Sequence, residues 1–424
     1  MMTSSFEERR RCERLDAAAL SRLQCGRLNA LLQNILPHNR LYAEKLADVQ
    51  IPLTSLDELA EFPFTYKEEL VSGVHGTDLA ANLTYPIERY VRFHRTSGTH
   101  GRPMVVLDTK DDWQWWVNTW QFVLDAAELG PEDRVVLAFS FGPFIGFWSA
   151  HDAAIARDCL VVPTGGLNSV ARLELIRSTH ATAVFCTPSY ALHLAEVAAH
   201  NQMDVATFDV RRILVAGEAG GSIPEIRGRI ESAWNAKVVD HAGASEVGPW
   251  GYPSANGRGL HIIETEFHAE FLSIESGQAA GEGELAELVL TTLGRSGSPV
   301  FRYRTGDLVR PTWNAAGEVQ FVLLDGGVLG RVDDMMTIRG VNVFPSAIEQ
   351  ILRSFPEVVE YRLRARRMGE MDALEIEMED RLQAPTRVAQ ELHLRLGLKV
   401  EVTTVPLGSL PRFEGKGKRF VDER

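Results

Sequence analysis

The chain has 424 residues, of which 45% are hydrophobic and 24% are charged, a composition typical of a globular protein. It is too long for one ordinary hydrophobic core, so we expect at least two domains. A net charge of −13 argues against non-specific binding of nucleic acid. No window of about 18 uninterrupted apolar residues occurs, which predicts that the chain does not span a membrane.

The negative charge is confined to one part of the chain. Residues 1–330 hold 28 Lys/Arg and 41 Asp/Glu, whereas residues 331–424 hold 16 of each. This break in composition predicts a large domain over residues 1–330 and a small one over residues 331–424. Residues 1–16 lack the apolar centre of a secretory signal, and the four cysteines show no CxxC spacing. We therefore expect a reducing, cytoplasmic location.

The first two thirds of the chain change from helical periodicity to alternating strands and helices. Residues 6–48 and 113–129 have helical patterns. Short apolar runs typical of buried parallel strands follow at residues 134–139, 160–163, 183–186, 213–216 and 237–239, and helices are predicted between them at 169–178, 188–199 and 224–234. In such α/β sheets ligands bind beyond the carboxyl ends of the strands, so the loops there should form the wall of a site.

A different pattern begins near residue 281. Period-two alternation predicts antiparallel strands, with a turn at residues 305–307 and a linker at residues 330–334. These strands are expected at residues 284–292, 300–303 and 319–324. The tail predicts helices at 345–355 and 386–396 and strands at 358–366, 373–379 and 400–405. The predicted fold class is a large N-terminal α/β domain with parallel and antiparallel sheet plus a small C-terminal α+β domain.

Two stretches have compositions that suit ligand binding. The first is a loop rich in hydroxyl groups and glycine that could cradle phosphate oxygens, formed by Thr96, Ser97, Gly98, Thr99, Gly101 and Arg102. It lacks Walker A spacing, and by itself such a turn is more often a solvated hairpin. The second sets Phe139, Phe141, Phe144, Phe147 and Trp148 among glycines. It suits either a core helix start or an aromatic-walled pocket.

Further motifs follow the loop in a fixed order. They are Gly217-Glu218-Ala219, Gly243-Ala244-Ser245-Glu246, Tyr303-Arg304-Thr305-Gly306-Asp307, Gly330-Arg331-Val332-Asp333-Asp334 running into residues 338–345, and Lys416 in a glycine-rich tail. Together they resemble the adenylate-forming (acyl-CoA synthetase) superfamily. Within it, the resemblance is closest to the phenylacetate–CoA ligase family, and it extends from about Phe62 to the end of the chain.

The resemblance implies a two-step reaction that uses ATP, Mg²⁺ and coenzyme A. A carboxylate attacks the α-phosphate of ATP to give an acyl-adenylate and pyrophosphate, and a thiol then displaces AMP. Catalysis of the first step requires charge compensation and positioning, because it brings two anions together. The implied acid is a small aromatic one, such as a phenylacetate- or benzoate-like carboxylate, held by the five aromatic residues with Gly243 and Ala244.

The resemblance also assigns roles to single residues. Glu246 would bind Mg²⁺, Asp307 and Arg331 would contact the ribose, and Lys416 would bridge the carboxylate and the α-phosphate. The other nucleotide-binding residues would be Thr96, Ser97, Gly98, Thr99, Gly101, Arg102, Gly217, Glu218, Ala219, His241, Ala242 and Ser245. Arg339 and Gly340 would contact coenzyme A, and Asp333 would be the hinge. Without the family, Glu246 and Asp307 could be turn residues and Lys416 part of a disordered tail.

Some features depart from the family pattern or leave alternatives open. Ala242 stands where relatives have a tyrosine that stacks on adenine, so another group would have to cover that face. Residues 249–260 lack cysteines, so we expect no additional metal site there. The acceptor could instead be an amine or a carrier protein, or the chain could be a non-catalytic binding relative. The arginine-rich residues 362–367 could contact coenzyme A or form a solvated strand face. Relatives are often homodimers.

Overall fold

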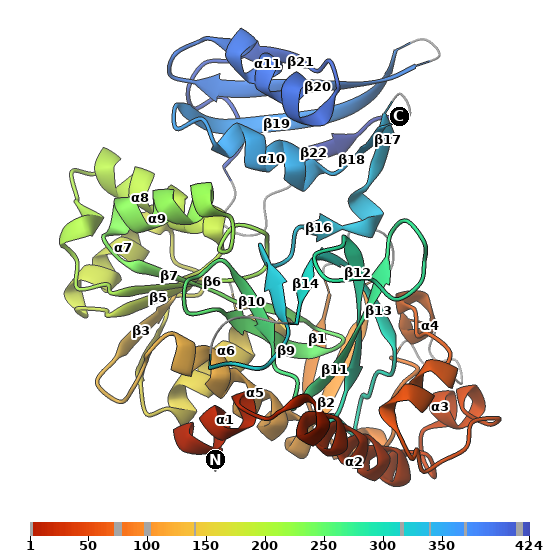
Figure 1. The fold of residues 1–424 in the computed structure, drawn as a ribbon. Helices are drawn as coiled ribbons and strands as arrows, with labels where there is room; N and C mark the ends of the chain where they lie inside the picture. Colours follow the sequence, from red (N-terminus) through yellow and green to blue (C-terminus); the bar gives the residue numbers. More distant parts are fainter. Residues whose placement is uncertain are drawn as a thin grey trace.

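The computed structural model describes residues 3–71, 79–96, 103–139, 141–313, 318–338, 341–368, 371–412 and 419–424. At the base of the molecule lie α1 (Phe6–Glu13), α2 (Ala17–Ile35), α3 (Arg40–Lys45) and, to one side, α4 (Lys67–Val71) (Figure 1). Residues 6–48, which the sequence predicts to be helical, form the three helices α1, α2 and α3. Each of them begins anew because Ser5, Asp16 and Asn39 cap their first turns with the side chain.

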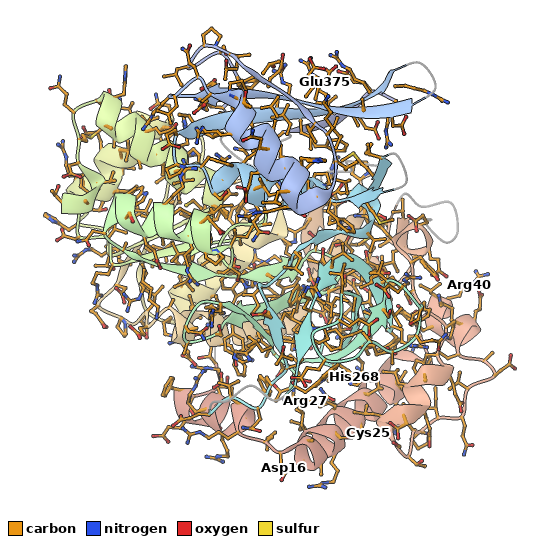
Figure 2. All side chains as sticks on the ribbon, turned by 45° about the horizontal axis from the view of Figure 1, so that its top comes forward. Asp16, Cys25, Arg27, Arg40, His268 and Glu375 are labelled. Carbon is orange, nitrogen blue, oxygen red and sulfur yellow. The ribbon has the colours of Figure 1, made fainter. Side chains whose placement is uncertain are left out.

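Helix α2 packs beneath the antiparallel sheet. Figure 2 shows Cys25 and Arg27 of α2 close to His268 of β11 (Phe267–Ser273). Arg27 donates to the carbonyl of Thr265 at 2.7 Å, and Gln24 Oε1 lies 3.1 Å from His268 Nδ1. These polar contacts attach the N-terminal helices to the body of the large domain.

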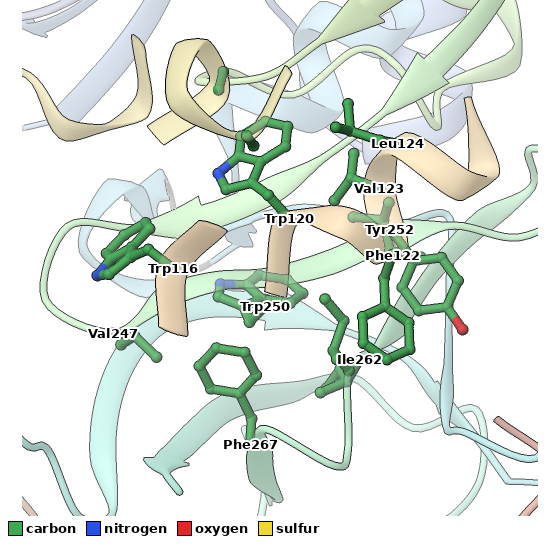
Figure 3. Close-up of a cluster of buried hydrophobic side chains, with 14 of the residues drawn as sticks. Trp116, Trp120, Phe122, Val123, Leu124, Val247, Trp250, Tyr252, Ile262 and Phe267 are labelled. Atoms are coloured by element: carbon green, nitrogen blue, oxygen red, sulfur yellow. The ribbon is translucent and has the colours of Figure 1, made fainter. Parts of the chain in front are cut away.

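A hairpin of β1 (Tyr90–Arg95) and β2 (Val105–Thr109) leads directly into α5 (Lys110–Ala126). The helix begins three residues before the predicted start, because Thr109 and Asp112 form a capping box. Its buried side chains, among them Trp116, Trp120 and Phe122, pack against Trp250 and Phe267 of the antiparallel sheets (Figure 3). Helix α5 is thus the centre of the largest hydrophobic core.

The alternating strands form one parallel sheet, as predicted. Its strands are β3 (Arg134–Leu137), β4 (Leu160–Pro163), β5 (Ala183–Cys186), β6 (Arg212–Val215) and β7 (Lys237–Asp240), in the order β4-β3-β5-β6-β7. The helices of this region are α6 (Ile145–Ala156), α7 (Ser169–Ser178), α8 (Pro188–His200) and α9 (Pro224–Trp234). Because all five strands are parallel, their carboxyl ends share one edge of the sheet.

Two antiparallel sheets complete the large body. One has the order β14-β15-β10-β9-β8, with β8 (Ala242–Ala244), β9 (Gly248–Pro253), β10 (Gly259–Ile262), β14 (Pro311–Thr312) and β15 (Leu323–Asp325). The other has the order β11-β12-β13-β16, with β12 (Ala286–Thr292), β13 (Tyr303–Val309) and β16 (Gly330–Arg331). Short 3₁₀ helices lie at η1 (Leu56–Glu61), η3 (Ile87–Arg89) and η4 (Val205–Thr207).

Four sequence predictions in this region are wrong in detail. The strand expected at residues 300–303 begins only at Tyr303, and the one expected at 319–324 is confined to Leu323–Asp325. The predicted turn at residues 305–307 lies inside β13, where Gly306 has φ +74° and accommodates an irregularity of the strand. Gly330 and Arg331, predicted as linker, pair with β13, because backbone hydrogen bonding outweighs the local glycine signal.

The last part of the chain forms a separate layer, above the rest in Figure 1. It contains η5 (Val332–Asp334), β17 (Met336–Ile338), β18 (Val341–Val343), α10 (Pro345–Arg353), β19 (Val358–Met368), β20 (Met371–Asp380), α11 (Pro385–Leu396), β21 (Glu401–Thr404) and β22 (Phe420–Asp422). Strand β22, which the sequence did not predict, pairs in parallel with β19. A hydrophobic core of its own, including Ile348, Leu363 and Leu392, supports this layer. In the part of the chain that the structure describes, no helix is both long and apolar enough to cross a membrane.

Candidate active site

The predicted phosphate loop connects β1 and β2. Thr96 closes its base, since the Thr96 N–H donates to the Met104 carbonyl at 3.0 Å and the Met104 N–H donates to Thr96 Oγ1 at 3.0 Å. Ser97, Gly98, Thr99, Gly101 and Arg102 lie outside the described residues. The N–H of Arg95 donates to the carbonyl of Pro143 at 2.8 Å, so the hairpin lies beside the aromatic stretch.

Glu246 is enclosed by the protein. Its side chain is 8% exposed, and Oε1 lies 2.9 Å from Lys67 Nζ. Burial, and then the charge of Glu246, raises the pKa of the neighbouring Tyr303 well above its usual range, so this phenol stays protonated and hydrogen-bonds to the carboxylate. The arrangement is that of a paired, oriented carboxylate, which differs from a solvated turn residue.

Lys67 is a site residue that the sequence reasoning missed. It comes to Glu246 because Thr65 forms a bridge with Tyr303, and the Thr65 carbonyl accepts from the N–H of Arg304 at 3.0 Å. This pairing attaches the start of α4 to β13 over more than 200 residues of sequence. A single lysine after an apolar turn has no chemical signature of its own, so only the folded chain identifies it.

Asp307 and Arg331 are cross-strand partners in β13 and β16. Arg331 Nη1 donates to Asp307 Oδ1 at 3.0 Å, and Nη2 donates to the carbonyl of Thr305 at 3.1 Å. The two residues expected at the ribose are therefore together. A carboxylate can accept from both ribose hydroxyls, so this donor set fits a nucleoside.

The segment Gly217-Glu218-Ala219 follows β6 at the carboxyl edge of the parallel sheet. Gly217 has φ +91°, a conformation that favours glycine. Glu218 Oε1 accepts from the N–H of Ser189 at 2.7 Å, in the first turn of α8. Gly221, four residues after Gly217, approaches Asp240 so closely that a Cβ on Gly221 would lie 2.4 Å from Asp240 Oδ1. The loop is thereby fixed against the end of β7.

His241 to Ser245 run from the end of β7 through β8. His241 Nδ1 lies 2.7 Å from the carbonyl of Gly251, and its ring packs 4.2 Å from that of Trp120. Burial lowers the pKa of His241 to about 4, so the ring is neutral near pH 7. Ala242 of β8 is half-buried and pairs with Gly251 of β9. Trp120 also donates to Ser149 of α6 at 2.9 Å, which connects this segment to the helix of the aromatic stretch.

The aromatic stretch forms two groups of rings at the start of α6. Phe139 stacks on Phe147, with centroids 4.2 Å apart, and Phe144 meets Phe147 edge-on at 6.2 Å. Phe141 meets Trp148 edge-on at 5.0 Å. Apart from the buried Phe139, these rings are half-buried or exposed, so they retain apolar surface that is free to face a ligand. This differs from a fully packed core helix.

Of the candidate coenzyme A groups, only the arginine-rich residues 362–367 lie among the described residues. Arg339 and Gly340 lie outside the described residues, as does Lys416. Along β19 the alternate arginines have carboxylate partners: Arg362 and Arg364 approach Glu377 at 3.5 and 3.2 Å, and Arg366 approaches Glu375 at 3.0 Å. This pairing favours the interpretation of the arginine run as a solvated strand face.

Charged side chains also line the contact between α8 and α9 and the C-terminal layer. Arg412 Nε lies 3.8 Å from Glu196 Oε2 of α8, and the cleft around this pair includes Arg229 of α9 and Arg353 of α10. Asp333, the expected hinge, is exposed in η5 and lies 3.5 Å from Arg331 Nη2.

The fold and the site together define an AMP-forming acid–thiol ligase. Residues 340–424 match the family described as AMP-binding enzyme C-terminal domain. Over 423 residues the chain is 31% identical to phenylacetate–coenzyme A ligase of Escherichia coli K12, covering 96% of this chain and 95% of that protein. The chain belongs to the phenylacetate–CoA ligase family. The predicted superfamily and fold class are therefore confirmed, and so are an acid substrate and the use of ATP, Mg²⁺ and coenzyme A.

Comparison with solved structures also indicates the arrangement of the two layers. A 2-hydroxyisobutyryl-CoA ligase in its postadenylation state, with 2-HIB-AMP, superposes with a TM-score of 0.92 at 25% identity, covering 100% of this chain and 94% of that one. The same ligase in the thioesterification state, with 2-HIB-AMP and CoA, gives 0.74 at 26% identity, covering 99% and 94%. Since one enzyme gives both scores, the arrangement of the present chain is similar to the postadenylation state.

Proposed function

We propose that this ligase activates a small aromatic carboxylic acid and transfers it to coenzyme A. One acid oxygen bonds to the α-phosphorus as the bond to pyrophosphate breaks. The thiol sulfur then bonds to the acyl carbon, its proton is lost to solvent, and AMP leaves. The observation that supports an aromatic substrate is the hydrogen bond from the N–H of Arg95 to the carbonyl of Pro143. It places half-buried phenylalanine and tryptophan rings beside the candidate phosphate hairpin.

We propose the following roles on this basis. Glu246 binds Mg²⁺, because a buried carboxylate beside one displaceable cation suits a metal that prefers one or two carboxylates plus phosphate oxygens. Asp307 accepts from the ribose hydroxyls, with Arg331 holding its orientation. Lys416 is the cation that the resemblance places at the α-phosphate. The enzymes of this family use Mg²⁺ and ATP, and in this chain these side chains position them.

We further propose that residues 331–424 move as a unit against residues 1–330 about Asp333. The similarity to the postadenylation state supports one pose of such a unit. A second pose would bring Arg339 and Gly340 to the thiol. Rigid-body rotation about a few residues is a common way to exchange catalytic groups between half-reactions.

The test is ATP–pyrophosphate exchange with phenylacetate, benzoate and ring-substituted acids, compared with straight-chain acids and repeated with coenzyme A. We expect exchange with aryl acids and an aryl thioester by mass spectrometry. Lys416→Ala should lower exchange at least a hundredfold, on the order of 3 kcal/mol of charge stabilisation, and spare thioester formation from a preformed adenylate. Exchange without a CoA thioester would direct attention to an amine or a carrier-protein thiol. Absence of exchange with every aryl acid would contradict the proposed substrate class.

A further inference from the structure

A buried ion pair connects the strand after the phosphate loop to the segment that holds Glu246. Arg295 and Asp108 have side chains with 0% exposure, and Arg295 Nη2 lies 2.7 Å from Asp108 Oδ1. Asp108 belongs to β2, and Arg295 lies between β12 and β13. Neither residue belongs to the motifs that identify the family, and nothing in the reaction chemistry requires them as reactants.

The other end of Arg295 reaches the backbone at Glu246. Its Nη1 donates to the carbonyl of Ser245 at 3.0 Å and to the carbonyl of Glu246 at 2.9 Å. These residues form a tight turn, closed by the N–H of Val247 donating to the carbonyl of Ala244 at 3.1 Å. One guanidinium therefore holds two successive peptide groups, and the fixed turn sets the direction of the Glu246 side chain.

The segment that carries Arg295 is itself fixed to the hairpin side of the molecule. The N–H groups of Ser296 and Gly297 donate to Asp112 Oδ1 at 2.8 and 3.0 Å. A Cβ at Gly297 would lie 2.2 Å from Asp112 Oδ2 and one at Gly294 2.3 Å from Trp115 Nε1, so both glycines allow a close approach to α5. Movement of Arg295 relative to α5 is thus restricted by hydrogen bonds just after it and by the close approach at Gly294 just before it.

We propose that Arg295, held by Asp108, is a positioning residue that fixes Glu246 relative to the phosphate hairpin for adenylation. This rests on the proposed role of Glu246 in binding Mg²⁺. A planar guanidinium can serve the carboxylate and both carbonyls at once. A lysine in the same place keeps the charge but has one nitrogen, which cannot reach all of these acceptors with the same geometry. The charge and the positioning function can therefore be separated by a conservative substitution.

The protein offers a matched control. Arg9 and Asp125 form a second buried pair in the same large body, with Arg9 Nε 2.6 Å from Asp125 Oδ2 and Nη2 2.8 Å from Oδ1. This pair joins α1 to α5, and within the described residues none of its hydrogen bonds or ion pairs reaches the turn at Glu246. Arg9→Lys therefore reproduces the cost of altering a buried arginine–carboxylate pair without altering the candidate site.

The experiment compares Arg295→Lys, Asp108→Asn and Arg9→Lys in the full chain. Isothermal titration calorimetry measures binding of ATP with Mg²⁺ and of ATP in EDTA. We expect Arg295→Lys and Asp108→Asn to weaken binding of Mg²⁺·ATP about tenfold, with metal-free ATP nearly unchanged, and Arg9→Lys to change neither. In exchange assays the half-saturating Mg²⁺ concentration should rise for the first two variants only. Thioester formation from a preformed adenylate should stay within about threefold of the wild type.

A Glu246→Gln background tests whether Arg295 acts through Glu246. In that background Arg295→Lys should have no further effect on Mg²⁺·ATP binding. A full additional loss there, or equal weakening of both forms of ATP, would overturn the inference. If Arg295→Lys unfolds the protein, Asp108→Asn answers the same question. If the wild type binds Mg²⁺·ATP but shows no exchange with any aryl acid, the proposed substrate class is refuted. The calorimetric comparison of the variants still tests the positioning role of Arg295 in that case.

Discussion

Asp307 and Arg331 lie directly opposite each other across β13 and β16, with Arg331 Nη1 3.0 Å from Asp307 Oδ1. Arg331 is also the last residue of its strand before η5, and Asp333 follows two positions later. One ion pair thus connects the proposed ribose site to the proposed hinge, so nucleotide contact and hinge position are structurally linked.

The Asp307–Arg331 pair should control affinity for the nucleotide. We expect Asp307→Asn to raise the KM for ATP at least tenfold, because an amide has one uncharged acceptor oxygen where a carboxylate offers two charged ones to the hydroxyls. Arg331→Lys should have a smaller effect in the same direction. Steady-state exchange kinetics measure both, with Arg310→Lys, which alters an exposed arginine that contacts the carbonyl of Gly283, as the control. An unchanged KM for ATP in Asp307→Asn would contradict the ribose assignment.

Lys67 should stabilise the protein mainly when the metal is absent. Replacing it with methionine leaves the buried carboxylate of Glu246 without its cation, and we expect a loss of roughly 1 kcal/mol in the free energy of unfolding. Adding Mg²⁺ with ATP should reduce this deficit, because the metal supplies the missing charge. Chemical denaturation with and without the ligands measures it. Lys45→Met is the control, since Lys45 pairs at 2.7 Å with Glu69, a carboxylate that is more exposed than Glu246 and has no proposed role in metal binding. An identical deficit with and without Mg²⁺·ATP would argue against metal binding at Glu246.

Trp148 should limit the size of the acid. Its indole donates to the carbonyl of Gly142 at 3.0 Å and packs against Phe141. Trp148→Ala therefore removes a ring from the proposed acid pocket together with the hydrogen bond that holds the loop at Gly142. We expect kcat/KM to rise for longer or bulkier aryl acids and to fall for small ones. Trp313→Ala, at an exposed tryptophan that packs on Phe271, should leave the ranking unchanged. If Trp148→Ala also leaves the ranking unchanged, the residue is part of the core only.

Asp333→Pro should separate the two half-reactions. Proline fixes φ near −65°, which is compatible with the 3₁₀ conformation of η5 and therefore with the present pose. A rotation that changes this angle would be blocked. We expect pyrophosphate release to persist while CoA thioester formation falls at least tenfold. Full retention of both activities would show that rotation about Asp333 is unnecessary.

Glu196 should favour the present arrangement of the layers through its contact with Arg412. Glu196→Gln removes that attraction, and we expect the ratio of thioester formation to adenylation to rise about two- to fivefold as the C-terminal layer is released. Glu174→Gln, at a surface pair with Arg177 on α7, is the control. Rapid-quench measurement of each half-reaction gives the ratio. A fall in the ratio would mean that Glu196 supports the other pose.

The repeating parts of the fold could be predicted from sequence because their signals are local. Apolar runs separated by helical segments predicted the parallel sheet, and a glycine-punctuated motif such as Tyr303 to Asp307 has few other meanings once its neighbours occur in order. The same local reasoning failed where distant backbone pairing decides. Gly306 suggested a turn but lies within β13, Gly330 suggested a linker but begins β16, and β22 forms only because β19 provides an edge.

The sequence by itself determined the class of chemistry, since the ordered motifs name the groups that a nucleotide and an acid require. Tertiary structure decided how those groups are held. Lys67 meets Glu246 because Thr65 pairs with Tyr303, and Arg295 meets the same turn because Asp108 lies buried beside it. Lys67 and Arg295 have no periodic or motif signal, because the carboxylate that each of them pairs with is more than 170 residues away in the sequence. Only the folded chain brings each cation to its carboxylate, where low solvent exposure makes the pairing necessary.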